Sequence, residues 1–156
     1  MSPARTHSAR THSAIIDSPL SVADAHAFVA DPASGATVVF TGQVRDHAVP
    51  DETPDADARD VAGLDYEVYE GVAQDTLAAL VAEVAERWPT VRAIWAEHRI
   101  GSLAISDLAV VVGVSSPHRD TACEAGRYLI DTLKATVPIW KKEHWVDGGH
   151  HWPGTD

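Results

Sequence analysis

The lysines of this chain are few and lie close together. Only three occur among the 156 residues, at Lys134, Lys141 and Lys142, and arginine supplies the remaining 12 − 3 = 9 basic residues. Lys141 and Lys142 directly follow the apolar segment Pro138–Trp140, which we expect to be partly buried. An amine beside an apolar segment suits acid–base or amine chemistry, because burial disfavours its charged form. Composition alone leaves open a simpler explanation, in which these cations only complement the C-terminal end of a helix.

Two further basic positions lie at the ends of expected elements. His118 and Arg119 open an expected helix, where free N–H groups and an arginine fork attract anions. Arg45 follows an expected strand, and Gly42 within that strand would let a ligand or another backbone approach closely. Each of these residues would also suit a solvent-exposed position without a function. A few local cations can nevertheless dominate a pocket, so an anionic ligand is compatible with an acidic chain.

The histidines and the single cysteine indicate less. A zinc site needs three or four ligands in a defined geometry, and a histidine pair in a glycine-rich tail is more typical of a flexible segment. We therefore expect no metal from His118, His144, His150 and His151. Cys123 lies on an expected helix, where the role of a small packed residue is favoured over that of a nucleophile.

Length and charge predict one globular domain that binds neither nucleic acid nor membrane. The formal charge is 12 − 23 = −11, whereas counterion release on nucleic acid requires a basic face. The longest apolar run, residues 108–114, is far shorter than the ~20 residues that span a bilayer. The N-terminus lacks the apolar core of a secretory signal. With one cysteine no internal disulfide can form, so we expect a reducing, cytoplasmic setting.

Hydrophobic patterning predicts a domain over residues 15–146. We expect helices over 22–29, 74–88 and 117–134, and strands over 35–44, 64–69, 91–100, 108–115 and 139–145. Ser116 is expected to cap the last helix, with Pro117 in its first turn. Strands in pairs with helices between them predict an α+β fold, with helices packed on a mostly antiparallel or mixed sheet. No GxGxxG or GxxxxGK[ST] motif is present, which argues against a nucleotide-phosphate loop.

Three segments are expected outside regular structure. Residues 1–14, which contain a repeated ARTHS, are expected to form a disordered tail. Residues 46–60 hold two prolines and many acids, and we expect a mobile loop. Residues 147–156 are rich in glycine and histidine, and we expect a flexible tail.

Four segments between Gly35 and Glu143 resemble the large, catalytic subunit of molybdopterin synthase. They are GATVVFTGQVRDH, LDYEVYEGVA, ERWPTVRAIWAEHRIGSL and VVVGVSSPHRDTACEAGRYLIDTLKATVPIWKKE. The motifs FxGxVR, YExY, HRIG, SxHR and LKxxxPIWKKE occur in that order and cover most of the expected domain. The acidic loop after His47 looks expanded relative to the family, and the C-terminal HHWPGTD departs from its usual ending.

The resemblance implies a fold, a reaction and partners. Proteins of this family have a single α/β hammerhead-type domain and form homodimers. Each subunit docks a small ubiquitin-like sulfur carrier, which gives a heterotetramer. The carrier's C-terminal Gly-Gly thiocarboxylate enters a pocket and supplies sulfur to cyclic pyranopterin monophosphate. The product is molybdopterin, so the chain is expected to be a sulfurtransferase of molybdenum cofactor biosynthesis that needs no cofactor of its own.

The resemblance also implies residue roles. Lys134 and Lys141 match catalytic lysines, which would orient the thiocarboxylate and move protons as sulfur adds. Phe40 matches an aromatic residue that lines the pocket. The substrate-binding positions implied by the motifs are Gln43, Val44, Arg45, His118, Arg119, Lys134, Lys141, Lys142 and Glu143.

The spacing of Arg119 and Lys134 predicts how the site is assembled. Fifteen residues apart on one helix, they lie ~60° apart around the axis but ~22 Å apart along it. One small pterin can hardly contact both from one subunit. We therefore expect a composite site, with His118 and Arg119 from one protomer and Arg45, Lys134 and Lys141 from the other.

Two other functions remain as alternatives. A binding module for phosphorylated small molecules or for a ubiquitin-like partner would need the arginines but not Lys134. A zinc-binding protein would use the histidine-rich tail. The lysines at the motif positions favour the enzyme.

Overall fold

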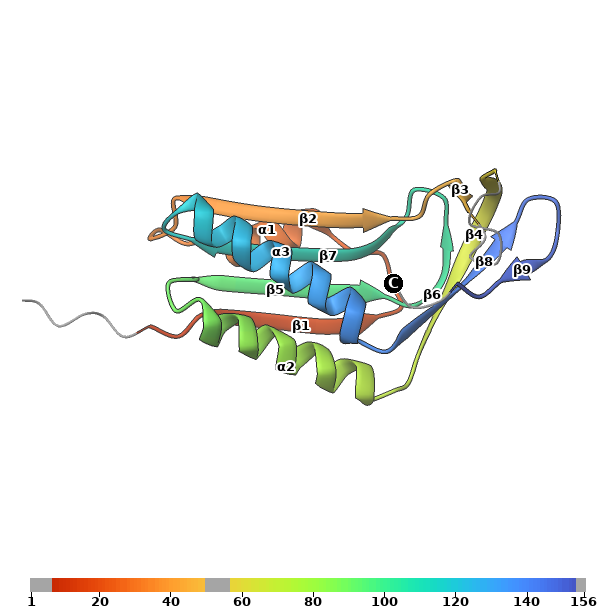
Figure 1. The fold of residues 1–156 in the computed structure, drawn as a ribbon. Coiled ribbons are helices and arrows are strands. Elements are labelled where there is room, and N and C mark those ends of the chain that lie inside the picture. The colour runs from red at the N-terminus through yellow and green to blue at the C-terminus, as the bar shows by residue number, and fades with distance from the viewer. Residues whose placement is uncertain (1–6, 50–56, 154–156) are drawn as a thin grey trace, which may run out of the picture.

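The structure is a computed structural model, and it describes residues 7–49 and 57–153. Twelve elements follow one another in these residues (Figure 1): β1 (Arg10–Ile16), α1 (Val22–Val29), β2 (Ala36–Gln43), β3 (His47–Ala48), β4 (Arg59–Val68), α2 (Val72–Arg87), β5 (Ala93–Arg99), β6 (Gly101–Ala104), β7 (Leu108–Ser116), α3 (Arg119–Thr136), β8 (Ile139–Trp145) and β9 (His150–His151).

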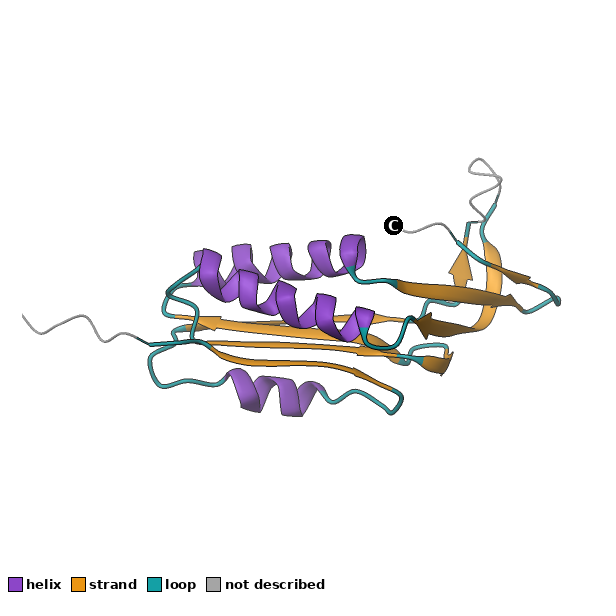
Figure 2. Cartoon of the chain, turned by 90° about the horizontal axis from the view of Figure 1, so that it is seen from below, coloured by secondary structure: helices purple, strands orange, loops and turns teal. Residues whose placement is uncertain are grey.

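The larger sheet has the strand order β1-β5-β7-β2 and is covered on both faces by helices. β1 pairs with β5 in parallel, and the other two pairs are antiparallel. Figure 2 shows α2 and α3 on one face and the short α1 on the other. Because both faces are covered, the central strands β5 and β7 are buried along nearly their whole length.

The main core lies between this sheet and the two long helices. In α2 the apolar residues Leu77, Leu80, Val81 and Val84 follow the helical period of 3.6, and all four are buried. Leu129 and Leu133 of α3 join the same cluster. The periodicity therefore predicted correctly which face of α2 packs inward.

The smaller sheet lies beyond one end of the larger sheet (Figure 1). In it β4 pairs antiparallel with β8 on one side and with β3 and β6 on the other. β8 is the strand that directly follows α3, separated from it only by residues 137–138. The end of α3 and the start of the smaller sheet are thus held next to each other by a very short connection.

The α+β class predicted from the element order is confirmed, and several details are corrected. Residues 10–14, expected within a disordered tail, form most of β1. The 147–156 segment, expected to be a flexible tail, contains β9, which pairs with β8. β6, which begins at Gly101, is not among the expected strands. Of the expected mobile loop, residues 50–56 lie outside the described residues.

The start of α3 also differs from the expectation. His118 occupies the N-cap position with extended backbone angles, and its side chain makes no capping hydrogen bond. Pro117 precedes the cap instead of lying in the first turn, and Ser116 is still the last residue of β7. Since β7 continues further than its apolar run, the helix begins two residues later than expected.

Candidate functional site

A cavity of about 160 Å³ lies where the smaller sheet meets the ends of β2 and α3. Its lining brings together five of the residues singled out in the sequence: Gln43, Arg45, Lys134, Lys141 and Glu143. The remaining lining residues are His47, Ala48, Val61, Leu64 and Tyr66. The cavity thus collects residues from four separate parts of the chain.

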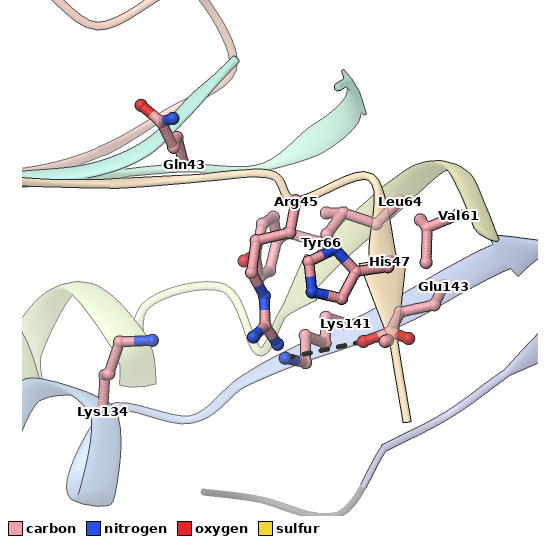
Figure 3. A pocket seen from close by; sticks show the side chains of 10 residues that line it. Gln43, Arg45, His47, Val61, Leu64, Tyr66, Lys134, Lys141 and Glu143 are labelled. Atoms are coloured by element: carbon pink, nitrogen blue, oxygen red, sulfur yellow. Dashed lines mark ion pairs between the residues drawn. The ribbon is translucent and has the colours of Figure 1, made fainter. Parts of the chain in front are cut away.

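Arg45 is positioned by its buried neighbour Val44. The Val44 N–H donates to the Asp107 carbonyl at 3.0 Å, and the Ser106 N–H donates to the Val44 carbonyl at 2.9 Å. The Val44 side chain packs against Leu64 in a small core cluster. Arg45, the next residue, points away from this cluster, as consecutive side chains of an extended chain do. Figure 3 shows its guanidinium pointing toward Lys141.

Lys134 reaches the cavity from the last turn of α3. Its neighbour Leu133 is buried in the main core, so Lys134 is left on the outer side of the helix. The helix ends at Thr136 with Val137 as the C-cap residue, and the Val137 N–H donates to the Leu133 carbonyl. A lysine in this position also complements the negative end of the helix dipole.

Lys141 and Glu143 project from the same face of β8, because side chains alternate along a strand. The Lys141 Nζ lies 3.7 Å from Glu143 Oε1 (Figure 3). Glu143 is 6% exposed, and within the described residues its Oε2 is buried without a hydrogen-bond partner. A buried carboxylate next to cations balances part of their charge and restrains the lysine.

The charge balance of the cavity favours an anionic ligand. Among the described lining residues, Arg45, Lys134 and Lys141 carry positive charge and Glu143 is the only carboxylate. Amines and a guanidinium in a concave site can hold a phosphate or a carboxylate and can also donate protons. Leu64 and Tyr66 add an apolar wall on the β4 side.

Val44 and Lys142, both implied as substrate-binding residues by motif, do not line this cavity. Val44 is 3% exposed in the core. Lys142 projects from the other face of β8, and its Nζ lies 5.6 Å from the centre of the Trp152 ring. Their neighbours in sequence reach the cavity because the backbone is extended at both places.

Phe40 lines a second cavity and not the cationic one. This apolar groove, about 430 Å³ in volume, runs between β2 and α3. It is lined by Val38, Phe40, Cys123, Gly126, Arg127, Ile130, Asp131 and Lys134. Lys134 therefore borders both spaces. A Cβ at Gly126 would lie 3.5 Å from Val38 Cγ1, an ordinary van der Waals contact, so the packing of α3 on β2 does not require glycine there.

His118 and Arg119 are exposed at the far end of α3, and neither lines the cationic cavity. The helix is continuous from Arg119 to Thr136, so the separation of ~22 Å between Arg119 and Lys134 follows from its rise per residue. One chain alone does not bring the two ends of α3 to one small ligand.

Two aromatic residues of the cavity, His47 and Tyr66, were not predicted from the sequence as site residues. Tyr66 is part of the YExY motif, which was the available signal, and it lies in β4 opposite Lys141. His47 follows Arg45 by two residues and lines the same cavity. The strand pairing that brings Tyr66 to Lys141 joins residues 75 positions apart, which local patterns do not reveal.

Neither a candidate metal site nor a membrane-spanning helix is found among the described residues. Residues 7–49 and 57–153 contain no group of three or more His, Cys, Asp or Glu side chains that could hold a metal ion. His144 instead contacts Asp65 at 2.7 Å, and His151 stacks on Trp145. No helix in the described part of the chain has the length and apolar character needed to cross a membrane.

Fold and cavity together define an α+β protein with a concave site of clustered amines and a guanidinium, groups that suit a small anionic ligand. Residues 15–136 match the family described as MoaE protein. The chain is 41% identical over 139 residues to the molybdopterin synthase catalytic subunit of Nostoc sp., covering 89% of this chain and 79% of that protein. The corresponding subunit of Staphylococcus carnosus is 43% identical over 141 residues, covering 90% and 87%.

Solved structures agree with the sequence comparison. The crystal structure of molybdopterin synthase from Staphylococcus aureus superimposes with a TM-score of 0.78 at 40% identity, covering 90% of this chain and 95% of that one. The MoaE protein of Burkholderia ambifaria gives a TM-score of 0.71 at 30% identity, with coverage of 94% and 90%. The chain therefore belongs to the MoaE family of molybdopterin synthase catalytic subunits, enzymes that transfer sulfur in the formation of molybdopterin.

Proposed function

We propose that this chain transfers sulfur from the C-terminal thiocarboxylate of a small ubiquitin-like carrier to cyclic pyranopterin monophosphate. The observation that carries the proposal is the convergence of Arg45, Lys134 and Lys141 on one cavity. The carrier tail and the cyclic phosphate are both anions, and three cations in one concave site suit both. The more distant structure from Helicobacter pylori is described as a complex of subunits 1 and 2 of molybdopterin-converting factor.

In this proposal the lysines act on the sulfur-bearing anion. Lys134 and Lys141 would orient the thiocarboxylate and transfer protons as sulfur adds to the pterin and its ring opens. Arg45 would hold the phosphate through its guanidinium fork. Glu143 lies 3.7 Å from the Lys141 amine and would keep that amine directed at the ligand. The reaction would take place in the cytoplasm.

A second copy of the chain would complete the site. β2 is an edge strand of the larger sheet, and the apolar groove beside it reaches Lys134. Gly126 and Arg127, at the midpoint between Arg119 and Lys134, line the groove. If a two-fold axis passes near them, Arg119 of one copy lies beside Lys134 of the other. The homodimer would then carry two cationic sites and, with one carrier per site, form a heterotetramer.

Reconstitution tests the proposal directly. The purified chain would be mixed with a thiocarboxylated carrier and cyclic pyranopterin monophosphate, and molybdopterin would be detected as its fluorescent oxidised derivative. We expect product from the natural chain and a loss of at least about 100-fold with Lys134→Ala, the range typical of a lost proton-transfer group. Tight carrier binding without any product would instead favour a binding module.

A further inference from the structure

His98 is a buried histidine directly behind the cationic cavity, and no step of the proposed reaction uses it. It belongs to the HRIG motif, at the end of β5, and is 7% exposed. Its ring Nδ1 lies 2.8 Å from the carbonyl oxygen of Arg99. A carbonyl only accepts, so Nδ1 carries the proton and donates it, which fixes both the tautomer and the ring plane.

The fixed imidazole contacts the wall of the cavity. Its ring centre lies 4.8 Å from that of Tyr66, and the two planes meet at 83°. This edge-to-face arrangement is one of the two that aromatic pairs favour. Tyr66 lines the cavity, and its backbone is paired with Lys141 on one side and with Gly101 on the other.

His98 is also held in the neutral form. Burial lowers its pKa to about 4; the hydrogen bond to Arg99 opposes this shift, and the charge of Lys134 adds to it. At neutral pH the His98 imidazole behind the cavity therefore carries no charge. A charged residue there would repel the lysines or compete with them for the anion.

We propose that His98 is a positioning residue for the sulfur-transfer site, which locks the Tyr66 ring as the flat wall against which the planar pterin packs. The inference rests on the proposed function for the identity of the substrate. It assigns a task to the HRIG motif: the Arg99 carbonyl orients His98, and His98 orients Tyr66. Lys141, paired with Tyr66, then faces a heterocycle held in one orientation.

Two variants of His98 separate its ring from its hydrogen bond. His98→Asn keeps an N–H donor near the Nδ1 position but removes the ring that contacts Tyr66. His98→Phe keeps a ring but removes the donor. We expect His98→Asn to raise the KM for the pterin about 10-fold, as displacement of an orienting wall does. His98→Phe should restore KM to within about threefold of the natural value, because the edge-to-face contact survives.

A double-mutant cycle with Tyr66→Ala tests whether His98 acts through Tyr66. We expect the double variant His98→Asn/Tyr66→Ala to have the KM of Tyr66→Ala alone, within about twofold, because coupled residues are non-additive. Circular dichroism and the melting temperature show that each variant is folded. Multiplicative increases in KM in the double variant, or an unchanged KM in His98→Asn, would overturn the inference. Absence of product from the natural chain would instead overturn the proposed function.

Discussion

At the scale of single residues, the two adjacent lysines of β8 face opposite sides of one strand. Lys141 lies in the cationic cavity beside Glu143, whereas Lys142 lies over the Trp152 ring. The motif PIWKKE contains both, and the resemblance implied a catalytic role for Lys141 alone but placed both lysines among the substrate-binding residues. The distinction comes from the alternation of β8 and from its pairing with β4.

Alanine substitution of these two lysines is a matched comparison. We expect Lys141→Ala to lower kcat for molybdopterin formation by at least about 100-fold, since a group that stabilises charge in the transition state is lost. Lys142→Ala removes an equal side chain from the outer face, and its kcat should stay within about threefold of the natural value, as for a surface cation. Equal losses in the two variants would contradict the assigned geometry.

The buried His98 gives a prediction on pH and stability. Its folded pKa of about 4 lies below the ordinary value of 6.5, so protonation favours the unfolded chain. The free energy of unfolding should therefore fall as pH drops below 6.5 and level off below about 4. For this group alone the fall between pH 7.5 and 5 is about 2 kcal/mol.

Urea unfolding at these two pH values measures the effect. His98→Phe should lose most of this part of the pH dependence, whatever its absolute stability. A proton NMR titration of His98 in the natural chain should show a flat ring shift from pH 8 to 5.5. A midpoint near 6.5 would mean that the ring is accessible to water.

At the scale of elements, apolar patterning predicted the long helices, the central strands and β2, but not β1 or the short strands β3, β6 and β9. α2 and β7 contain many apolar residues with a clear period or a continuous run. β1 reads RTHSAII, and only its last three residues are apolar. It forms a strand because its backbone pairs with β5 and because Arg10, its first residue, binds the carboxylate of Asp31. β3 and β9, two residues each, exist only through their partners.

The anchor of β1 is Asp31, which follows α1. Its Oδ2 accepts from Arg10 at 2.8 Å, its Oδ1 accepts from the Ala33 N–H at 2.8 Å, and Arg92 lies 3.3 Å from Oδ1. These contacts, that of Arg10 foremost, lower the pKa of Asp31 to about 2. The ionised carboxylate thus joins β1, α1 and the start of β5.

Asp31→Asn should lower the melting temperature and loosen β1 before the rest of the domain. The folded pKa is depressed, so the contribution of Asp31 is complete above pH 4 and is lost as pH falls through about 2. The difference in melting temperature between natural and variant chains should therefore be constant from pH 7 to 5 and shrink below pH 4. Hydrogen exchange of the residue 10–16 amides reports the local loosening. An unchanged exchange pattern would contradict the anchoring role.

At the scale of the whole molecule, the proposed site has two parts, at the two ends of α3. Local sequence patterns identified the cations at both ends, and helix geometry separated them by ~22 Å. The groove between β2 and α3 became visible only in the structure, because its residues come from strand and helix positions more than 80 apart. Phe40 is 41% exposed there, an apolar side chain on an edge strand that a second copy would cover.

Phe40→Asp should therefore convert a dimer to a monomer. A charge placed at the centre of an apolar interface is left unpaired and desolvated, which weakens association by about 100-fold or more. Sedimentation velocity measures the change. Val146→Asp is the control, because Val146 is 64% exposed and does not line the groove. A Phe40→Asp chain that stays dimeric would place the interface elsewhere.

In the proposed dimer, cations at both ends of α3 serve one sulfur-transfer site built from two copies of the chain. Equal amounts of Arg119→Ala and Lys134→Ala chains, each inactive alone, would be unfolded together, refolded and assayed for molybdopterin. Random pairing gives one intact site in half of the dimers, so we expect about a quarter of natural activity. A mixture of Arg45→Ala and Lys134→Ala chains should stay inactive. One protomer supplies both residues to each site, so every site in the mixture lacks one of them. Recovery in the second mixture, or none in the first, would contradict the shared site.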